Sequence, residues 1–388
     1  MTGIRVGIVT HHHFPRLGGM EIYNHMLAAA LSEQAGVGVA VACGTMPEIP
    51  RTFGYRYPVY RARSLSYLTP YLARRNLDAM IRRERVDILH GATLHGAGVD
   101  AVRAGQRHRL PTVVQSHGSD VQVVDDIGYG AGRNAGDRSR IQFALENANA
   151  VLAVSALNHA MILQAGGPPE RTHVAPPACA FEAISALPFK DLRAALGIDA
   201  EDFVIVTVGR NRPIKRMGLL FEALSILKRN GRRIRCLCVG PEEDLSRAAV
   251  EHNVGDRIHL VGRVPAPSTL YQGISPPFPL LINLYRAADL YVSVSYFEAF
   301  SLAAMDAIAC GTPILVTPRH GVIDVVREGE NGYVLQEETA DALADRLEAL
   351  AAMKETLNAR RDTVRASVSS YTWTATAASL ASLYRTLF

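Results

Sequence analysis

Short apolar runs, many of them β-branched, alternate with longer segments of helical periodicity along the whole chain. A strand buried on both faces of a parallel sheet is a continuous apolar run, and its alternation with helices indicates βαβ units. Two such series occur in succession, which predicts two doubly wound α/β domains. The predicted strands are residues 4–10, 37–43, 86–91, 111–117, 150–155 and 172–176, and then 203–209, 234–240, 258–262, 289–295, 313–317 and 332–336.

The two predicted domains are separated by a stretch that follows neither pattern. From Pro176 to Pro188 the chain contains several prolines and has no clear periodicity. Near the end of the chain the apolar spacing becomes that of an amphipathic helix. The 388 residues are enough for two domains, each with its own core. We therefore predict domains at residues 1–180 and 181–370 and a final helix at 371–388.

Composition excludes several classes of protein. A hydrophobic content of 48% with 20% charged residues is typical of a globular protein, and a net charge of +4 is too small to indicate nucleic acid as a partner. The five cysteines have neither metal-ligand nor secreted-framework spacing. The chain starts almost directly with a strand, which disfavours a signal peptide, and it contains no apolar run of about 20 residues. We expect a cytoplasmic protein.

Candidate chemistry is concentrated after the strand predicted at 289–295. Glu298 lies on the loop that follows this strand, and Asp306 falls in the second turn of an alanine-rich helix ending at Gly311. Open α/β sheets bind ligands at the carboxyl ends of their strands, and free backbone amides at a helix start favour anions. Surface acids at an ordinary helix start are the alternative.

A second candidate site follows the strand predicted at 203–209. Arg210 and Lys215 lie five residues apart on a strand-to-helix turn, where two cations can converge on a diphosphate. In the first half, His117 ends a strand at the same kind of sheet edge, and Gly18 and Gly19 open a helix where backbone can approach a ligand closely. Consecutive histidines at 11–13 do not converge easily on one metal ion.

These residues resemble a known family. Glu298, seven residues, Asp306 and a following Cys-Gly-Thr-Pro run resemble the nucleotide-sugar site of retaining glycosyltransferases of family four, which have the GT-B fold. The spacing of Arg210 and Lys215 matches the Gly-Arg-x-x-x-x-Lys motif of that family. The resemblance covers nearly the whole chain. It implies two Rossmann-like domains facing across a cleft, with the donor held by the second, the acceptor by the first, and the final helix crossing back to the first.

The resemblance also implies roles for individual residues. Glu298 is expected to contact the donor sugar, and Asp306, where the family usually has Glu, to bind the ribose. His117 would lie near the donor sugar, and Arg210 and Lys215 would stabilise the leaving diphosphate. The remaining donor-binding residues that it implies are Gly18, Gly19, Arg263, Val264, Ala299, Phe300, Ser301 and Leu302. Ser301 stands where the family usually has Gly.

The expected reaction moves a hexose or N-acetylhexosamine from a nucleoside diphosphate sugar with retention. UDP-glucose and UDP-N-acetylglucosamine are the favoured donors, and GDP-mannose is the alternative. No Asp-x-Asp motif follows a strand, so we expect neither a metal nor a cofactor, with protein cations neutralising the leaving group. No carboxylate identifies itself as a covalent nucleophile, which favours front-face attack.

The acceptor is predicted from acids on loops of the first domain. Carboxylates at Glu21, Asp120 and Asp125, with Asp126 and Asp137 nearby, favour a small polar acceptor, neutral or cationic, such as an aminocyclitol of antibiotic biosynthesis. The alternative is an anionic or lipid-linked acceptor, such as an inositol derivative, with the arginines of 61–85 at a membrane surface. A different GT-B enzyme, such as a sugar phosphorylase or nucleotide-sugar epimerase, and a non-catalytic binding subunit also stay open. The proline-containing insertion at 265–285 and the oligomeric state have no functional interpretation.

Overall fold

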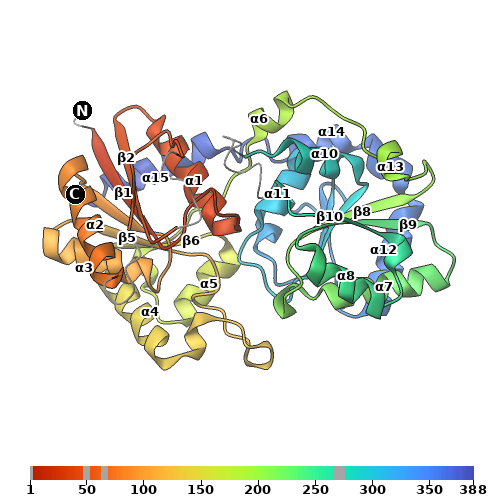
Figure 1. The fold of residues 1–388 in the computed structure, drawn as a ribbon, viewed down its shortest axis with the longest axis horizontal. Coiled ribbons are helices and arrows are strands. Elements are labelled where there is room, and N and C mark those ends of the chain that lie inside the picture. The colour runs from red at the N-terminus through yellow and green to blue at the C-terminus, as the bar shows by residue number, and fades with distance from the viewer. Residues whose placement is uncertain (1–2, 47–52, 63–68, 266–275) are drawn as a thin grey trace. The chain divides into compact units, whose positions relative to one another are not determined.

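The structure, a computed structural model, describes residues 3–46, 53–62, 69–265 and 276–388. The chain divides into two compact units, of which the first comprises Met1–Ala178 and Thr372–Phe388 and the second Cys179–Tyr371 (Figure 1). Residues 266–275 of the insertion predicted at 265–285 lie outside the described residues, as does Arg63 of the arginine-rich stretch. Each unit is a parallel α/β sheet with its own apolar core.

The first unit contains a seven-stranded sheet in the order β3-β2-β1-β4-β5-β6-β7. All its strand pairs are parallel, with Ile4 of β1 beside Val37 of β2. The strands are β1 (Ile4–Thr10), β2 (Val37–Cys43), β3 (Val59–Arg61), β4 (Ile88–Gly91), β5 (Thr112–Ser116), β6 (Ala150–Ala153) and β7 (Thr172–Val174). The helices are α1 (Gly19–Ser32), α2 (Thr69–Glu84), α3 (Ala97–His108), α4 (Ala135–Asn147), α5 (Ala156–Gln164) and α15 (Trp373–Arg385).

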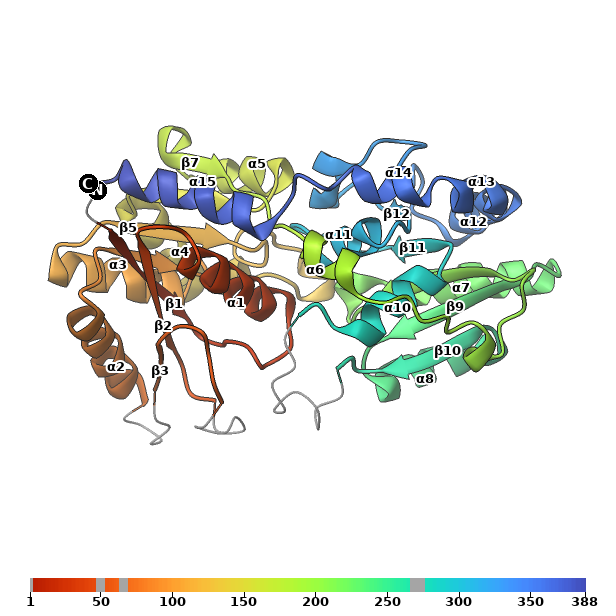
Figure 2. The same ribbon diagram turned by 90° about the horizontal axis from the view of Figure 1, so that it is seen from above.

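Helix α15 packs on α1 (Figure 2) and is tied to the sheet by a buried chain of hydrogen bonds. The Tyr384 hydroxyl donates to His90 Nδ1 over 2.7 Å, His90 Nε2 donates to Gln115 Oε1 over 3.1 Å, and Gln115 Nε2 donates to the Tyr23 hydroxyl over 2.8 Å. Burial lowers the pKa of His90 to about 4, so the ring is neutral and can donate once and accept once. Every member of the chain therefore has a partner.

The second unit contains a six-stranded parallel sheet in the order β10-β9-β8-β11-β12-β13. Its strands are β8 (Phe203–Val208), β9 (Ile234–Val239), β10 (Ile258–Gly262), β11 (Leu290–Ser293), β12 (Ile314–Val316) and β13 (Gly332–Val334). The helices are α6 (Phe181–Ala186), α7 (Met217–Arg229), α8 (Glu242–Glu251), α10 (Pro279–Ala287), α11 (Leu302–Ala309), α12 (Ala340–Ala352), α13 (Lys354–Ala359) and α14 (Arg361–Ala366). The main apolar cluster joins α7 and α12 to the strands between them.

Every predicted strand is present within two residues of its predicted bounds. Strand β3 was not predicted, because three residues at the edge of a sheet form no apolar run. The predicted fold class of two doubly wound parallel α/β units is confirmed.

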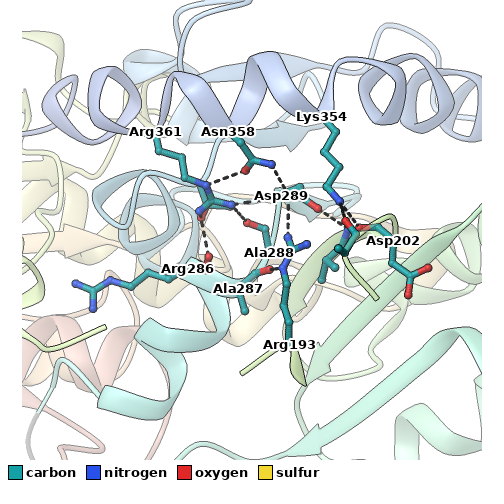
Figure 3. A network of polar contacts seen from close by, with 12 residues as sticks. Arg193, Asp202, Arg286, Ala287, Ala288, Asp289, Lys354, Asn358 and Arg361 are labelled. Atoms are coloured by element: carbon teal, nitrogen blue, oxygen red, sulfur yellow. Dashed lines mark hydrogen bonds and ion pairs between the residues drawn. The ribbon is translucent and has the colours of Figure 1, made fainter. Parts of the chain in front are cut away.

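A buried carboxylate at the start of β11 ties the second unit together (Figure 3). Asp289 is fully buried and accepts hydrogen bonds from Val204 N at 2.8 Å, Arg193 Nη2 at 2.8 Å and Asn358 Nδ2 at 3.1 Å. The Arg361 guanidinium lies 4.0 Å away. Charge and hydrogen-bonding capacity are thus both satisfied inside the unit.

Replacing Asp289 with Ala should strongly destabilise the second unit. The change leaves Arg193 and Arg361 without their shared carboxylate, and breaking a buried ion pair in this way costs about 3–5 kcal/mol. Urea unfolding followed by circular dichroism measures the loss. Asp345→Ala, at an exposed position of α12, is the control and should change stability by less than about 0.5 kcal/mol. Equal stability of the two variants would contradict the role given to Asp289.

Candidate functional site

Three loops of the second unit are joined by backbone hydrogen bonds at the carboxyl ends of β8, β11 and β12. The loop after β11 donates from Tyr296 N to Ile214 O over 2.8 Å, and from Glu298 N to Arg319 O over 3.0 Å. Gly321 N donates a hydrogen bond to Glu298 O over 2.8 Å. Parallel strands end at one edge of the sheet, so loops distant in sequence meet there. Glu298 is held between its two neighbouring loops.

The Glu298 carboxylate forms an ion pair with the ammonium group of Lys215. Ser295 Oγ donates to the same carboxylate oxygen over 3.5 Å. Both charged side chains are partly exposed, at 28% for Lys215 and 22% for Glu298, so a ligand can reach them. The structure thus brings together two residues that are 83 positions apart and that the sequence predicted for one site.

Helix α11 begins directly after this loop and presents free backbone amides. Ser301 is its N-cap, with Oγ accepting from Ala304 N over 3.2 Å. The amides of Phe300, Ser301 and Leu302 donate no hydrogen bond to any residue that the structure describes. Unpaired amides at a helix start, beside the Lys215 ammonium, form a site suited to an anion. The Ser that replaces the usual Gly therefore caps the helix.

Asp306 lies one turn into α11, and its carboxyl group is buried although part of the residue reaches the surface. Burial raises the pKa of Asp306 to about 7. No hydrogen bond or ion pair to this carboxyl group occurs within the described ranges. Its neighbours include Tyr285, whose hydroxyl is also buried without a partner. A ligand hydroxyl would supply the missing partner.

Replacing Asp306 with Asn should stabilise the protein in a pH-dependent way. The folded carboxyl has a pKa of about 7 and the unfolded one about 3.9, so its favourable contribution is complete below pH 4 and lost as pH rises to 7. The stability advantage of Asp306→Asn should therefore grow between pH 4 and 7 and then level off. Thermal unfolding of both proteins across this range measures it, and a difference that does not change with pH would contradict the assignment.

Other predicted donor-site residues lie on the surface of the second unit. Arg210 is exposed, and its side chain has no hydrogen bond or ion pair with a described residue. The Lys215 side chain passes Gly209, where an added Cβ would lie 3.9 Å from its Cδ. Arg263 is exposed and Val264 is partly buried, after the end of β10. Arg210 is therefore placed on the same turn as Lys215 but is not held in contact with Glu298.

The sequence interpretation missed the polar residues around β12 and α12. Arg216 and Arg319 both pair with Glu338, and the Arg319 guanidinium lies 4.2 Å from the centre of the Tyr296 ring. His320 is buried beside them with Nε2 unpartnered, and burial together with Lys215 lowers the pKa of His320 to about 3. Their position just after β12, at the carboxyl edge of the sheet, was the signal that could have found Arg319 and His320.

In the first unit, the loop after β5 places His117 beside a paired carboxylate. Asp120 is buried and accepts from His117 N over 3.3 Å and from the His95 ring. The hydrogen bond from His95 to Asp120 raises the pKa of His95. Burial lowers the pKa of His117 to about 4, so its ring is neutral, and its Nε2 has no partner among the described residues. His95 was not predicted, because its partner lies 25 residues away.

The other acids predicted for the acceptor are mostly compensated. Asp125 pairs with Arg133 at 3.3 Å, and Asp137 pairs with Arg140 at 2.9 Å. Glu21 lies in the first turn of α1, next to Gly18 and Gly19. An added Cβ at Gly19 would meet nothing within 4 Å, so packing does not require glycine there. The first unit therefore does not present the cluster of free carboxylates that the sequence suggested.

Within the described residues, no three His, Cys, Asp or Glu side chains are grouped to hold a metal ion. The three consecutive histidines point to different partners: His11 to Asp100, His12 to Arg16 and His13 to Tyr57. In the same part of the chain, no helix has the length and apolar character needed to cross a membrane.

Comparison with known proteins gives two family matches and several curated relatives. Residues 17–180 match Glycosyltransferase Family 4, and residues 188–366 match Glycosyl transferases group 1. The chain is 32% identical over 239 residues to the D-inositol 3-phosphate glycosyltransferase of Thermobispora bispora, and 27% over 294 residues to that of Gordonia bronchialis. The alignments cover 56% and 72% of this chain but 51% and 62% of those relatives. The chain thus matches less than two thirds of the length of each.

Solved structures share the fold over nearly the whole chain. Sucrose-phosphate synthase from Thermosynechococcus elongatus has a TM-score of 0.83 at 22% identity, covering 99% of both chains. HepE of Anabaena, in complex with UDP and glucose, has a TM-score of 0.73 at 18% identity, covering 99% of this chain and 100% of its own. At these identities the likeness establishes the fold alone, and that fold is GT-B.

Proposed function

The chain belongs to glycosyltransferase family four, and on that premise we propose that it transfers, with retention of configuration, a hexose or N-acetylhexosamine from a UDP-sugar to a phosphorylated polyol. The observation that carries the proposal is the Lys215–Glu298 pair beside the free amides at the start of α11. This arrangement offers positive potential for a diphosphate and a carboxylate for sugar hydroxyls. GDP-mannose remains the alternative donor.

The residues of the second unit suit departure of a nucleoside diphosphate. As the bond between the anomeric carbon and the phosphate oxygen breaks, negative charge develops on the diphosphate. Lys215, the exposed Arg210 and the amides of 300–302 would stabilise that charge. The acceptor oxygen bonds to the anomeric carbon on the face the diphosphate leaves, and its proton passes to the departing phosphate oxygen. No nucleophile from the protein is required, and configuration is retained.

Glu298 also holds Lys215 in place. Its carboxylate compensates the Lys215 ammonium and fixes it near the helix start. Binding of a diphosphate supplies a competing anion, so Lys215 can turn to the phosphate while Glu298 accepts hydrogen bonds from sugar hydroxyls. A charged site held ready in this way needs little reorganisation during the reaction.

The proposed acceptor differs from the one favoured by the sequence. An aminocyclitol acceptor was inferred from free carboxylates, and the comparisons give it and an antibiotic pathway no support. Asp120, Asp125 and Asp137 have cationic or histidine partners, so they provide little net attraction for a cation. The curated relatives are named for D-inositol 3-phosphate, which is a phosphorylated polyol. These two observations favour the anionic, inositol-type alternative.

Removing either cation of the β8 turn should slow transfer with the fold intact. Lys215→Ala and Arg210→Ala should each lower kcat/KM by about 10²-fold, the effect of losing one group that stabilises a developing charge. Lys228→Ala, on the last turn of α7, removes a lysine away from the turn and should leave kcat/KM unchanged. Near wild-type turnover of Lys215→Ala would show that this lysine does not stabilise the leaving group.

Donor and acceptor classes can be tested together. Thermal shift with UDP-glucose, UDP-N-acetylglucosamine and GDP-mannose should identify a UDP-sugar, since a bound ligand raises the melting temperature by mass action. With that donor, an inositol phosphate should be glycosylated in preference to inositol and to an aminocyclitol. Transfer only to the aminocyclitol, or to no acceptor of the three, would refute the proposed acceptor class.

Glu298→Ala should lose sugar transfer and still bind UDP. Its carboxylate is expected to contact the sugar, while the amides of 300–302 stay in place to hold the diphosphate. Isothermal titration with UDP and a transfer assay separate the two effects. Glu337→Ala, an exposed acid of the same unit, is the control. A loss of UDP affinity as large as the loss of turnover would reassign Glu298 to the nucleotide.

A further inference from the structure

The first unit contains a cavity of about 800 Å³ that no step above uses. It lies where β1 and β2 end, bounded by Ala73, Arg74 and Leu77 of α2 and by α3. Thr10 and Cys43 at the strand ends and Gly44 and Thr45 just beyond form one side. The connection between the end of a strand and the start of a helix is where open parallel sheets bind ligands.

Three arginines line this cavity: Arg74 of α2, and Arg103 and Arg107 of α3. A single lining acid, Asp100, lies 3.7 Å from His11, which also lines the cavity. Asp78 of α2 does not line the cavity, but it pairs with Arg107 at 3.0 Å and lies 3.9 Å from Arg74. It also accepts from His108 at 2.9 Å. Three guanidinium groups against two carboxylates leave the cavity with a net positive charge.

Of these three arginines, Arg103 is the one that forms no ion pair with a carboxylate of a described residue. Its guanidinium lies 5.5 Å from the centre of the Phe143 ring of α4, a contact that orients the group without neutralising it. Thr45 has no hydrogen-bond partner among the described residues, so its hydroxyl can donate to a ligand. A guanidinium and a hydroxyl that line one cavity are both groups that can donate hydrogen bonds to phosphate oxygens.

We propose that this cavity binds the phosphate group of the acceptor, with Arg103 as its principal contact and Arg74 and Arg107 supplying further positive charge. The identity of the ligand as the acceptor rests on the proposed function; the binding of a phosphomonoester rests on the cavity alone. The volume admits a phosphorylated six-membered polyol and leaves room for water. A lipid phosphate headgroup has the same chemistry as a soluble phosphomonoester, and the test below distinguishes the two ligands.

The test replaces Arg103 with Met, which keeps the stem packed on Phe143 and removes the charge. Titration of an inositol monophosphate against the donor-free protein should show affinity weakened by about 10- to 100-fold, as expected for a lost charge-assisted hydrogen bond. In the transfer assay, KM for the same acceptor should rise by a similar factor, while affinity for UDP stays that of the wild type. Arg82→Met, on an exposed part of α2 outside the cavity, should change neither.

The outcomes separate the two proposals. If the wild type glycosylates an inositol phosphate but Arg103→Met keeps its affinity and KM, the cavity proposal is overturned and the proposed function stands. If binding depends on Arg103 but only neutral acceptors are glycosylated, the cavity remains a phosphate site and the proposed acceptor is overturned. Arg103-dependent binding to vesicles carrying phosphatidylinositol phosphate, with no binding of the free inositol phosphate, would replace the soluble ligand by a lipid and overturn the proposal.

Discussion

The parallel sheet of the second unit imposes the constraint on which its candidate site depends. Every strand ends at the same edge, so the loops after β8, β11 and β12 must share a small space, and backbone hydrogen bonds from Tyr296 and Glu298 fix their register. Only because these loops are joined can Lys215 and Glu298 form an ion pair across 83 residues of sequence. The free amides of α11 come from the same geometry, since that helix starts where the Glu298 loop ends. Positive potential at this edge therefore follows from topology as much as from residue type.

Several buried polar groups inside the two sheets are satisfied, whereas three at the carboxyl ends of strands are not. Asp289 and the chain from Tyr384 to Tyr23 are buried and fully partnered, which is what a stable core requires. In contrast, His117 and His320 each leave a buried nitrogen unpartnered, and Asp306 has a buried carboxyl with no donor among the described residues. All three lie beyond the carboxyl ends of strands. An unsatisfied buried group costs about 1–3 kcal/mol, and its occurrence at these places is explained by a ligand that completes its bonding.

Prediction from sequence succeeded where one physical effect decides the outcome. Apolar runs dictated the strands, the edge rule placed Glu298 and Lys215 at carboxyl ends of strands, and the family resemblance joined them in one site. Prediction from sequence failed where the position or charge of a side chain depends on a residue from another part of the fold. His95 comes from the β4 loop and Asp120 from the β5 loop, and no local pattern indicates that they meet. The Asp306 carboxyl is buried close to Tyr285 of α10 and to Cys179, which lie far from it in sequence.

The charge of the acceptor was hard to predict because it also depends on residues that meet only in the folded unit. Counted along the sequence, the acids of residues 120–137 suggest an attraction for cations, because their neighbours in space are unknown. In the folded unit Asp120, Asp125 and Asp137 pair with histidine or arginine, so a ligand nearby experiences only a small part of their negative charge. The arginines of α3 show the opposite behaviour: Arg103 and Arg107 lie four residues apart on one face of the helix and line one cavity with Arg74 of α2. The net charge at a site is therefore set by the groups that stay unpaired after folding, and at this cavity the unpaired group is the Arg103 cation.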